Sequence, residues 1–444
     1  MSAVGVKAEG KTLHLQEHVE WFETLDENNL SIETLEREEV KAYHERAVNK
    51  LIHYLYENNS FYRAKLEEAG ITSASHVDFE EFSKIPFLTK DELREDSKVI
   101  LTKKKLAQLC CSTGTTGGKP IYIGHTLDEL YSYYFAPKYP SLMERVKNKV
   151  VANALPYEMS SSALTFHHEF QHLLNCTILP LGKGGAYSEP KKAIEFMQAW
   201  EAEVLVTTPS YAIVLWEAAQ EMNIDLTKDL KVSHIFLTGE GSSNSFRKRI
   251  ELIWGCTSTI LYGSLEAMLL GLECDSQSGF HLPDGHLYVE IVDPETNELL
   301  DPGQQGEIVI TTLLREGMPL LRYRTGDLGF IEESGCACGI NLPKLHLRGR
   351  SGDQIVLQSG SFSPFYLEDI LMQVEGVGNW YRFLVKGNSL TVEVEPFNDE
   401  VDKEYLAQLI EEKLEFYTNS PCTARVVEKV QRNDGKIKRV WYID

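Results

Sequence analysis

Residues 204–237, VLVTTPSYAIVLWEAAQEMNIDLTKDLKVSHIFL, contain a complete strand–helix–strand unit. Val204–Thr207 and His234–Leu237 are short apolar runs of strand length, and Tyr211–Met222 between them has the apolar spacing of a helix. A helix that connects two short buried strands is typical of α/β layering with parallel strand pairs. This stretch therefore predicts the fold class of the region around it.

The same alternation continues on both sides of this unit. Residues 191–201 predict another helix, and three further apolar runs predict strands at Val150–Ala154, Thr177–Leu181 and Thr259–Leu261. After residue 280 the pattern changes to strands separated by turn signals, which favours an antiparallel part, at His286–Val292, Gly306–Leu313 and Asp327–Glu332. We expect layered, mostly parallel sheets plus an antiparallel part.

The two ends of the chain have a different pattern of apolar and turn residues. Leu35–Asn58 has helical spacing with few breakers, and Thr89 stands three residues before Glu92, which is the spacing of a capping box. Near the other end, Phe383–Lys386 and Ser389–Val394 can pair across Gly387-Asn388, and residues 403–414 predict a helix. The last ninety or so residues therefore predict a small α+β unit.

Bulk properties exclude several classes of protein. A chain of 444 residues suits two or three domains and buries a large core without disulfides. Its formal charge of −22 argues against a nucleic-acid-binding protein, which needs a basic face. Met1–Lys11 lacks the apolar core of a signal peptide, and no apolar stretch has the length of a membrane span. With eight cysteines in so long a chain, we expect a cytoplasmic protein with thiols reduced or bound to metal.

The glycine-rich segment Cys110–Pro120, CCSTGTTGGKP, is the sharpest local feature. Its glycines let backbone N–H groups turn toward an anion, and its hydroxyls and Lys119 add donors and charge. It is not a Walker P-loop, because Thr113 and Pro120 occupy positions where that motif needs Gly and a hydroxyl residue. The segment suits a nucleotide triphosphate tail, although taken alone a solvated Gly/Thr turn explains it equally well.

Further motifs follow the glycine-rich segment in a fixed order. They are Gly239-Glu240-Gly241, Tyr262-Gly263-Ser264-Leu265-Glu266, Tyr323-Arg324-Thr325-Gly326-Asp327, Gly349-Arg350-Ser351-Gly352-Asp353 and Gly435-Lys436. In this order the set resembles the motifs of the adenylate-forming superfamily, which contains acyl-CoA synthetases, adenylation domains and luciferases. Each motif alone is weak, but the ordered set is specific.

Other segments resemble the phenylacetate–CoA ligase branch of that superfamily. They are Asn59–Arg63, Ile85-Pro86-Phe87, Thr208–Tyr211, Thr311–Leu313 and Met318–Leu320. The resemblance covers roughly residues 35–442 and leaves the first thirty or so residues without an assigned role.

The resemblance implies an AMP-forming carboxylic acid ligase. Such an enzyme uses ATP to activate a small carboxylic acid, with an aromatic acid favoured, to an acyl-adenylate and releases pyrophosphate. It then passes the acyl group to an acceptor, with coenzyme A favoured. Because two anions must meet, positioning and electrostatic stabilisation carry the reaction. The acceptor stays open between coenzyme A, an amine and a carrier-protein thiol, and the sequence names neither the acid nor the oligomeric state, with a homodimer one option.

The resemblance also assigns residue roles. Glu266 is the expected Mg²⁺ ligand, and Lys436 is the expected catalytic residue that bridges carboxylate and α-phosphate, with Lys438 as its competitor. The expected phosphate-binding residues are Ser112, Thr113, Gly114, Thr115, Thr116, Gly117 and Lys119, and the expected adenine- and ribose-binding residues are Gly239, Glu240, Gly241, Tyr262, Gly263, Asp327 and Arg350.

Two departures from the family pattern affect these roles. Leu265 replaces a usual hydroxyl residue, so the α-phosphate contact is missing or comes from Ser264 or Thr115. The doublet Gly117-Gly118, where relatives often have one glycine, leaves the role of Lys119 open.

The resemblance divides the chain into a large ATP- and acid-binding domain, residues 1–352, and a small, mobile α+β domain, residues 353–444. In the family the small domain swings about a hinge between the two half-reactions, and Asp353 stands at the matching position.

Four residues form a candidate structural zinc site. Cys336-Ala337-Cys338 puts two thiols on one turn, and Cys274 and His281 lie in an earlier segment. Three cysteines and one histidine make a closed tetrahedral ligand set of the kind that structural zinc uses, and several relatives resemble the pattern. The alternative is four unrelated reduced residues.

His168-Glu169-Phe170-Gln171-His172 matches H-E-x-x-H and by itself suggests a zinc metalloprotease. No convincing third ligand follows at the spacing of such proteases. The resemblance implies instead that this helix lies beside the acyl pocket, with Tyr157, His167 and His168 as pocket residues. A nucleotide-binding regulator without catalysis is a third interpretation, and the presence of Glu266 and Lys436 argues against it.

Overall fold

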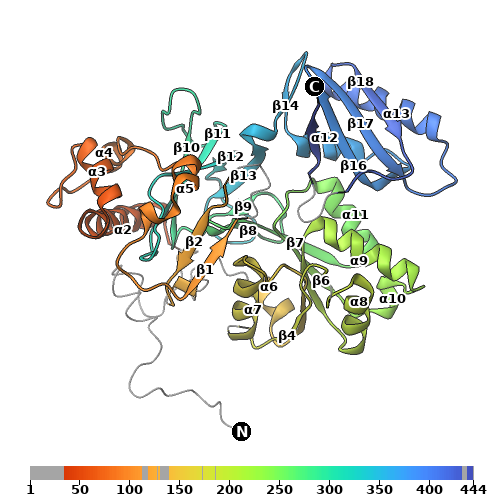
Figure 1. Ribbon diagram of the computed structural model, residues 1–444, viewed down its shortest axis with the longest axis horizontal. Helices are drawn as coiled ribbons and strands as arrows, with labels where there is room; N and C mark the ends of the chain where they lie inside the picture. Colours follow the sequence, from red (N-terminus) through yellow and green to blue (C-terminus); the bar gives the residue numbers. More distant parts are fainter. Residues whose placement is uncertain are drawn as a thin grey trace, which may run out of the picture.

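The computed structural model describes residues 35–112, 119–127, 129–130, 140–172, 174–185, 187–432 and 438–443. Among these residues, an 11-stranded sheet in the order β10-β11-β12-β13-β9-β8-β7-β6-β5-β3-β4 forms the centre of the molecule. Helical segments at the amino-terminal end lie on one side of it, and a separate small sheet lies above it (Figure 1).

One half of the central sheet is parallel, as the sequence predicts. Its strands are β3 (Val150–Asn153), β4 (Thr177–Pro180), β5 (Val204–Thr207), β6 (His234–Leu237) and the first part of β7 (Thr257–Ser264). The connecting helices are α7 (Ser162–His172), α8 (Pro190–Ala199), α9 (Pro209–Glu221), α10 (Leu226–Asp229) and α11 (Asn244–Trp254). The predicted strands β5 and β6 have the observed bounds, because both are completely buried apolar runs.

The other half of the sheet is antiparallel, which confirms the change of pattern after residue 280. It contains β8 (Met268–Glu273), β9 (Phe280–His281), β10 (Leu287–Val292), β11 (Gly306–Thr312), β12 (Tyr323–Glu332) and β13 (Lys344–Arg350). Strand β12 begins four residues before the predicted start, so a whole predicted site motif lies on a strand.

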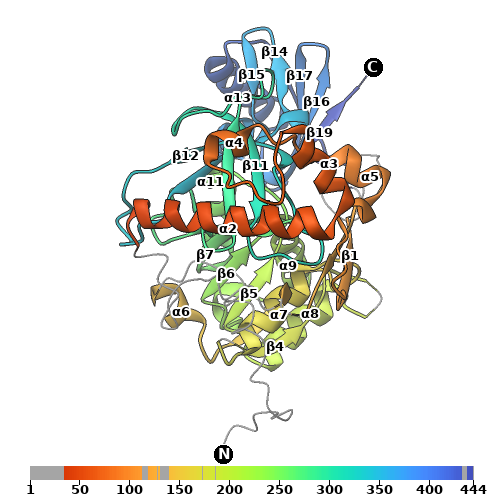
Figure 2. The same ribbon diagram turned by 90° about the vertical axis from the view of Figure 1, so that its left-hand side faces the viewer.

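The amino-terminal helices pack against the antiparallel half. Helix α2 (Arg37–Asn58) crosses this side of the molecule (Figure 2) and is followed by α3 (Ser60–Glu68), α4 (Phe79–Ser83), α5 (Lys90–Glu95) and the 3₁₀ turn η2 (Ser97–Ile100). The predicted capping box of Thr89 and Glu92 is present at the start of α5. The hairpin β1 (Gln108–Cys111) and β2 (Tyr122–His125), and then α6 (Pro140–Val146), lead into the parallel half.

Residues 355–432 and 438–443 form a small α+β unit with a four-stranded sheet in the order β18-β17-β16-β19. The predicted hairpin pairs β16 (Val377–Lys386) with β17 (Ser389–Pro396) across Gly387-Asn388. The predicted helix is α13 (Lys403–Thr418), one turn longer than expected. The remaining elements are α12 (Pro364–Met372), the hairpin β14 (Ile355–Leu357) and β15 (Gly360–Phe362), and strands β18 (Cys422–Val426) and β19 (Val440–Tyr442).

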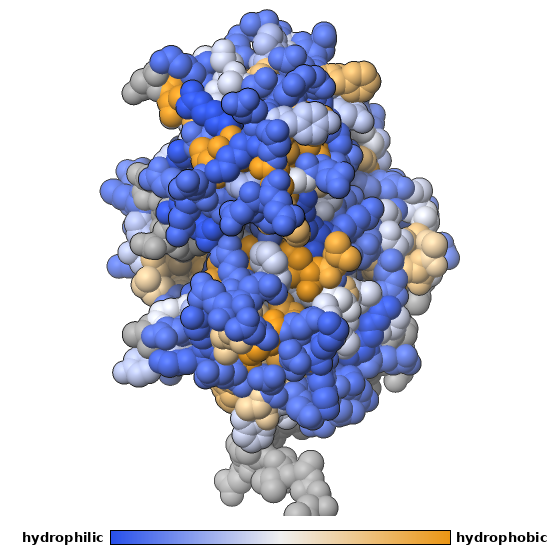
Figure 3. All heavy atoms as spheres, turned by 90° about the vertical axis from the view of Figure 1, so that its right-hand side faces the viewer, coloured by the Kyte–Doolittle hydropathy of each residue, from blue (hydrophilic) through white to orange (hydrophobic). Residues whose placement is uncertain are grey.

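The small unit packs against helices α9 and α11 of the parallel half. Figure 3 views the molecule from the right-hand side of Figure 1 and shows apolar side chains in the middle of that face. The guanidinium of Arg249 on α11 donates to the carbonyls of Met372 at 2.9 Å, Val377 at 2.7 Å and Gly378 at 2.8 Å. At the amino end of α11, Ser245 N–H donates to Asp369 at 2.8 Å, so acidic side chains of α12 meet the positive end of the α11 dipole. The short 3₁₀ turn η4 (Ser351–Asp353) connects the two units.

Candidate active site

Residues of three sequence motifs meet at Asp327. Asp327 lies on β12 and pairs in register with Arg350 at the end of β13, while Tyr262 lies on β7. The hydroxyl of Tyr262 donates to Asp327 Oδ2 at 2.6 Å, and Arg350 Nε donates to Asp327 Oδ1 at 3.3 Å. The structure thus brings together three residues that are expected to hold the adenine and ribose.

The electrostatics of this group follow from burial and opposite charge. Burial raises the pKa of Tyr262 well above its ordinary value, and the Asp327 carboxylate raises it further. Burial acts to lower the pKa of Arg350, but the carboxylates of Asp327 and Asp353 outweigh it and the pKa is raised. Arg350 is therefore a permanent cation and Tyr262 a permanent donor at neutral pH.

Glu266 stands at the tight turn between β7 and β8 and is 8% exposed. Tyr323, the first residue of β12, donates its hydroxyl to Glu266 Oε1 at 3.0 Å, and the guanidinium of Arg315 donates to the backbone carbonyl of Glu266. A fixed, largely buried carboxylate offers the hard oxygen ligand that Mg²⁺ prefers. Sequence reasoning quoted Tyr323 as part of a motif but assigned it no role, and nothing in the sequence identified Arg315.

The motif Gly239-Glu240-Gly241 follows β6 directly. Gly239 has φ +80°, a conformation that favours glycine, and a Cβ on Gly241 would meet the Phe365 ring at 2.0 Å. The carboxylate of Glu240 pairs with Lys183 at 2.8 Å and accepts from the Ser210 N–H at 3.3 Å, so it holds the loop in place. Although burial acts to raise the pKa of Glu240, Lys183 outweighs it and the pKa is lowered.

The glycine-rich segment leaves from the β1–β2 hairpin. Ser112 and Ile121 pair at the base of the segment. The Ser112 N–H donates to the Ile121 carbonyl, and the Ser112 hydroxyl accepts from the Ile121 N–H, both at 2.8 Å. Lys119 at the other end of the segment is exposed. The predicted phosphate ligands Thr113, Gly114, Thr115, Thr116 and Gly117 lie outside the described residues.

The predicted catalytic Lys436 also lies outside the described residues, whereas its competitor Lys438 is described. The Lys438 ammonium lies over the ring of Trp441, 4.9 Å from its centroid. Asp353, the predicted hinge, is exposed in η4, between the last strand of the large sheet and the first strand of the small unit.

The predicted pocket residues lie on and beside helix α7. The hydroxyl of Tyr157 and Nδ1 of His167 are 3.1 Å apart, and the rings of His167 and His168 meet edge to face at 5.8 Å. Burial raises the pKa of Tyr157 to about 12 and lowers the pKa of both histidines. His168 and His172 of the H-E-x-x-H sequence stack on each other at 5.9 Å, as expected for two residues one turn apart on a helix.

The predicted zinc ligands are brought together from two distant segments. The ligand atoms of Cys274, His281, Cys336 and Cys338 all lie within 4.8 Å of one another, and this is the cluster of metal-ligating side chains that the described part of the chain contains. The two sulfurs of Cys274 and Cys336 are 3.6 Å apart, and Cys338 Sγ is 3.4 Å from His281 Nε2. Tetrahedral zinc with Zn–S bonds of about 2.3 Å needs a similar separation, about 3.8 Å between sulfurs.

The second nitrogen of the histidine supports this arrangement. His281 Nδ1 is 2.9 Å from the Leu342 carbonyl, a contact that assigns the proton to Nδ1 and directs Nε2 toward the cysteines. The four residues present therefore fit a structural zinc ion.

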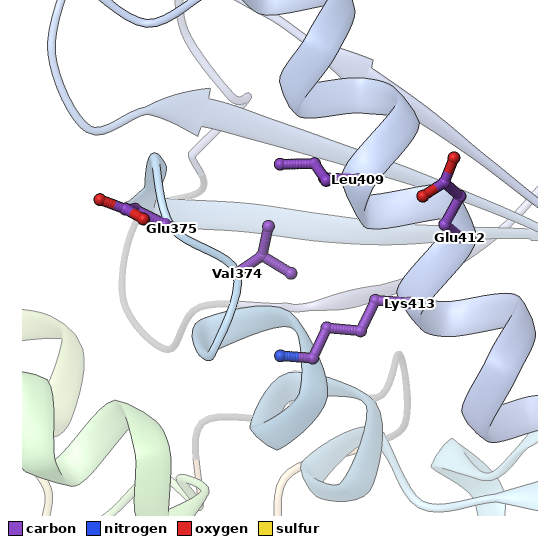
Figure 4. A pocket seen from close by; sticks show the side chains of 5 residues that line it. All are labelled: Val374, Glu375, Leu409, Glu412 and Lys413. Atoms are coloured by element: carbon purple, nitrogen blue, oxygen red, sulfur yellow. The ribbon is translucent and has the colours of Figure 1, made fainter.

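A surface groove on the small unit lies apart from these residues. It is lined by Val374, Glu375, Leu409, Glu412 and Lys413 (Figure 4). The Lys413 ammonium donates to the Gln373 carbonyl at 3.2 Å, so this side chain makes a hydrogen bond within the small unit.

Comparison with known proteins places this geometry in a family. The family model described as AMP-binding enzyme matches residues 22–313. The chain belongs to the AMP-binding enzyme family. It is 30% identical over 429 residues to phenylacetate-coenzyme A ligase of Thermus thermophilus, with 92% of this chain and 93% of that protein covered. The predicted membership of the phenylacetate–CoA ligase-like branch of the adenylate-forming enzymes is thereby confirmed, and the protein is an AMP-forming ligase.

Solved structures show the same fold. A 2-hydroxyisobutyryl-CoA ligase in the postadenylation state has a TM-score of 0.83 at 22% identity, with 93% of this chain and 91% of that chain covered. The same ligase in the thioesterification state has a TM-score of 0.65 at 22% identity, with 92% and 91% covered. The chain as a whole therefore superposes more closely on the first of these structures. Within the described part of the chain, no helix has the length and apolar character of a membrane span.

Proposed function

We propose that this AMP-binding enzyme activates a small aromatic carboxylic acid with ATP and transfers the acyl group to coenzyme A. The observation that carries the proposal is the convergence of four residues from one sheet: Tyr262 on β7, Glu266 in the β7–β8 turn, Asp327 on β12 and Arg350 on β13. The similarity over nine-tenths of the chain to phenylacetate-coenzyme A ligase supports the aromatic acid and the thiol acceptor.

We propose the following roles for the residues of the site. Asp327 and Arg350 hold the ribose, Tyr262 offers a ring face to adenine, and Glu266 supplies the oxygen ligand for the Mg²⁺ that accompanies ATP and offsets charge on its phosphates. The hydrogen bond between Ser112 and Ile121 fixes the start of the phosphate-binding segment. Lys436 bridges the two anions as a point charge, which lowers the repulsion that opposes their approach.

A pyrophosphate-exchange assay across a panel of carboxylic acids tests the first half-reaction. Acid-dependent exchange, followed by consumption of coenzyme A with the same acid, supports the proposal. Exchange without thiol consumption favours the second candidate, an amide ligase or a carrier-protein acylating enzyme. ATP binding without exchange favours a regulator.

The protease interpretation receives no support from the geometry. Among the described residues, the cluster of side chains placed to hold a metal ion contains neither His168 nor His172. The cluster that fits zinc is the separate set of three cysteines and His281.

We further propose that this set holds a structural zinc ion, with Cys274, His281, Cys336 and Cys338 as its four ligands. A closed set of four protein ligands leaves no position for a reactant, so the ion would stabilise the fold. We also propose that residues 353–444 move as a domain about Asp353, because η4 connects two units that have separate sheets.

A further inference from the structure

Glu266 is fixed by an unusually tight turn. A Cβ on Gly263 would lie 2.4 Å from the Met268 carbonyl oxygen, Met268 itself has φ +64°, and Ala267 N–H donates to Ser264 Oγ at 3.1 Å. A β-turn with a non-glycine residue at positive φ persists only where its surroundings hold it. The backbone of Glu266 is therefore set before any ligand binds.

The carboxylate of Glu266 is oriented by one phenol. Tyr323 is 1% exposed, and its hydroxyl donates to Oε1 of Glu266 at 3.0 Å. Among the described residues, no donor contacts Oε2. The arrangement fixes the plane of the carboxylate and leaves one oxygen for a cation.

Arg315 contacts the backbone of Glu266 and makes no hydrogen bond to its carboxylate. The Arg315 guanidinium donates to the backbone carbonyl of Glu266, and its charge interacts more strongly with the buried Glu129 than with Glu266. A neutral phenol orients the carboxylate while preserving its negative charge, which a bidentate arginine would have offset. The charge of Glu266 therefore stays available for a hard divalent cation.

We propose that Tyr323 is a positioning residue, which orients Glu266 so that Oε2 faces the divalent cation that accompanies ATP. The inference rests on the proposed function, because it takes Glu266 as the cation ligand. Tyr323 and Asp327 lie on the same strand, and Asp327 accepts from Tyr262, which precedes Glu266 by four residues. Each of the two motifs therefore supplies one tyrosine that donates to a carboxylate of the other motif. These two hydrogen bonds connect the ribose site with the cation site.

Tyr323→Phe tests the inference, with Mn²⁺ as the probe. The dissociation constant of Mn²⁺ is measured by electron paramagnetic resonance on the full chain with ATP and without any acid. Loss of a residue that orients a metal ligand costs about 10- to 100-fold in affinity, and we expect about a tenfold increase in the dissociation constant. The Mg²⁺ concentration for half-maximal exchange should rise in parallel.

Tyr43→Phe is the matched control, because Tyr43 is 2% exposed and donates to the Gly285 carbonyl, among the amino-terminal helices. It should bind Mn²⁺ as the wild type does. If Tyr323→Phe does not fold, Glu266→Asp gives a second test, since the shorter side chain keeps its charge but does not reach the phenol, and it should also weaken Mn²⁺ binding.

Wild-type Mn²⁺ affinity in Tyr323→Phe would overturn the inference, and so would wild-type affinity in Glu266→Gln. Failure of the proposed function would give a different result. No acid would then support pyrophosphate exchange, while Mn²⁺ binding with ATP would stay measurable.

Discussion

The guanidinium of Arg432 in the small unit donates to both carboxylate oxygens of Glu217 on helix α9, beside the central sheet, at 3.0 and 3.3 Å. The same guanidinium lies 4.0 Å from the ring centroid of Trp380, whose indole N–H also donates to Glu217. Arg432 precedes Lys436 by four residues. This contact therefore joins the two domains close in sequence to the expected catalytic lysine.

Arg432→Met should weaken acid-dependent pyrophosphate exchange more than acyl transfer from a supplied acyl-adenylate. A partly exposed bidentate pair with a cation–π contact contributes about 1 kcal/mol, so we expect roughly a three- to tenfold loss of exchange. Lys191→Gln is the matched control, because Lys191 pairs with Glu221 within the large domain and is exposed. Equal losses in both half-reactions would contradict a role of Glu217 and Arg432 in domain placement.

Lys436→Ala should lose most exchange activity while it still binds ATP. The lysine is expected to act only where carboxylate and α-phosphate meet, and each tenfold loss corresponds to about 1.4 kcal/mol of transition-state stabilisation. Lys438→Ala is the control, since Lys438 lies over the Trp441 ring. If Lys438→Ala loses exchange and Lys436→Ala keeps it, the assignment of the catalytic lysine is wrong by two residues.

Purified protein should contain about one zinc per chain by metal analysis. Cys338→Ser should lose the metal and lower the midpoint of thermal unfolding, because the binding energy of a structural ion is folding energy. Cys256→Ser is a suitable control, since Cys256 lies outside the cluster. Zinc-free protein with wild-type stability would show that the four residues are an unoccupied cluster of thiols.

Acid should destabilise the protein through His234. Burial lowers the pKa of His234 to about 4 from 6.5, and its two nitrogens contact Thr257 and Thr259. Since the unfolded chain binds this proton more strongly, the free energy of unfolding should fall as pH drops from about 6.5 to about 4, by up to about 3 kcal/mol from this residue. Urea unfolding of His234→Gln should show a smaller fall over that interval, and an unchanged pH dependence would contradict the assignment.

The sequence predicted the parts of the fold whose signal is local. Strands β5 and β6 were located because each is a buried apolar run with a helix on one side, and the turn at Gly387-Asn388 determined the β16–β17 pairing. The zinc ligands were grouped from residue type, the Cys-x-Cys spacing and the resemblance to relatives, and the chain brings the sulfurs of Cys274 and Cys336 to 3.6 Å.

Contacts that depend on tertiary placement were not predictable from one sequence. The hydroxyl of Tyr323 reaches Glu266 only because β12 and the β7–β8 turn face each other, and Arg432 meets Glu217 only when the small unit is docked. A tyrosine or a surface arginine has no local pattern that reports such a partner. The contact of Phe365 with Gly241 is of the same kind, since 124 residues separate the two positions.

A proline at position 353 tests whether the backbone of Asp353 is the hinge between the two units. Asp353 ends the 3₁₀ turn η4, and residues in 3₁₀ turns typically have φ of about −50 to −70°, close to the value that proline imposes. The preceding Gly352 has no Cβ, which removes one of the two clashes that a proline ring makes with the residue before it. Asp353→Pro is therefore compatible with the placement of the small unit in this structure, and it restricts any placement that needs another φ. We expect acyl transfer to fall at least about tenfold and adenylate formation to change by only a few fold.

Asp353→Ala separates the backbone effect of the hinge variant from its loss of charge. The Asp353 carboxylate helps to raise the pKa of Arg350, so its removal could disturb the ribose side of the site without any effect on motion. The alanine variant removes that charge but leaves φ free, and it should affect both half-reactions to a similar and small extent. Rates of exchange and of thioester formation are measured separately on both variants. If proline and alanine give the same pair of rates, Asp353 is an ordinary loop carboxylate and the pivot between the domains lies at another residue.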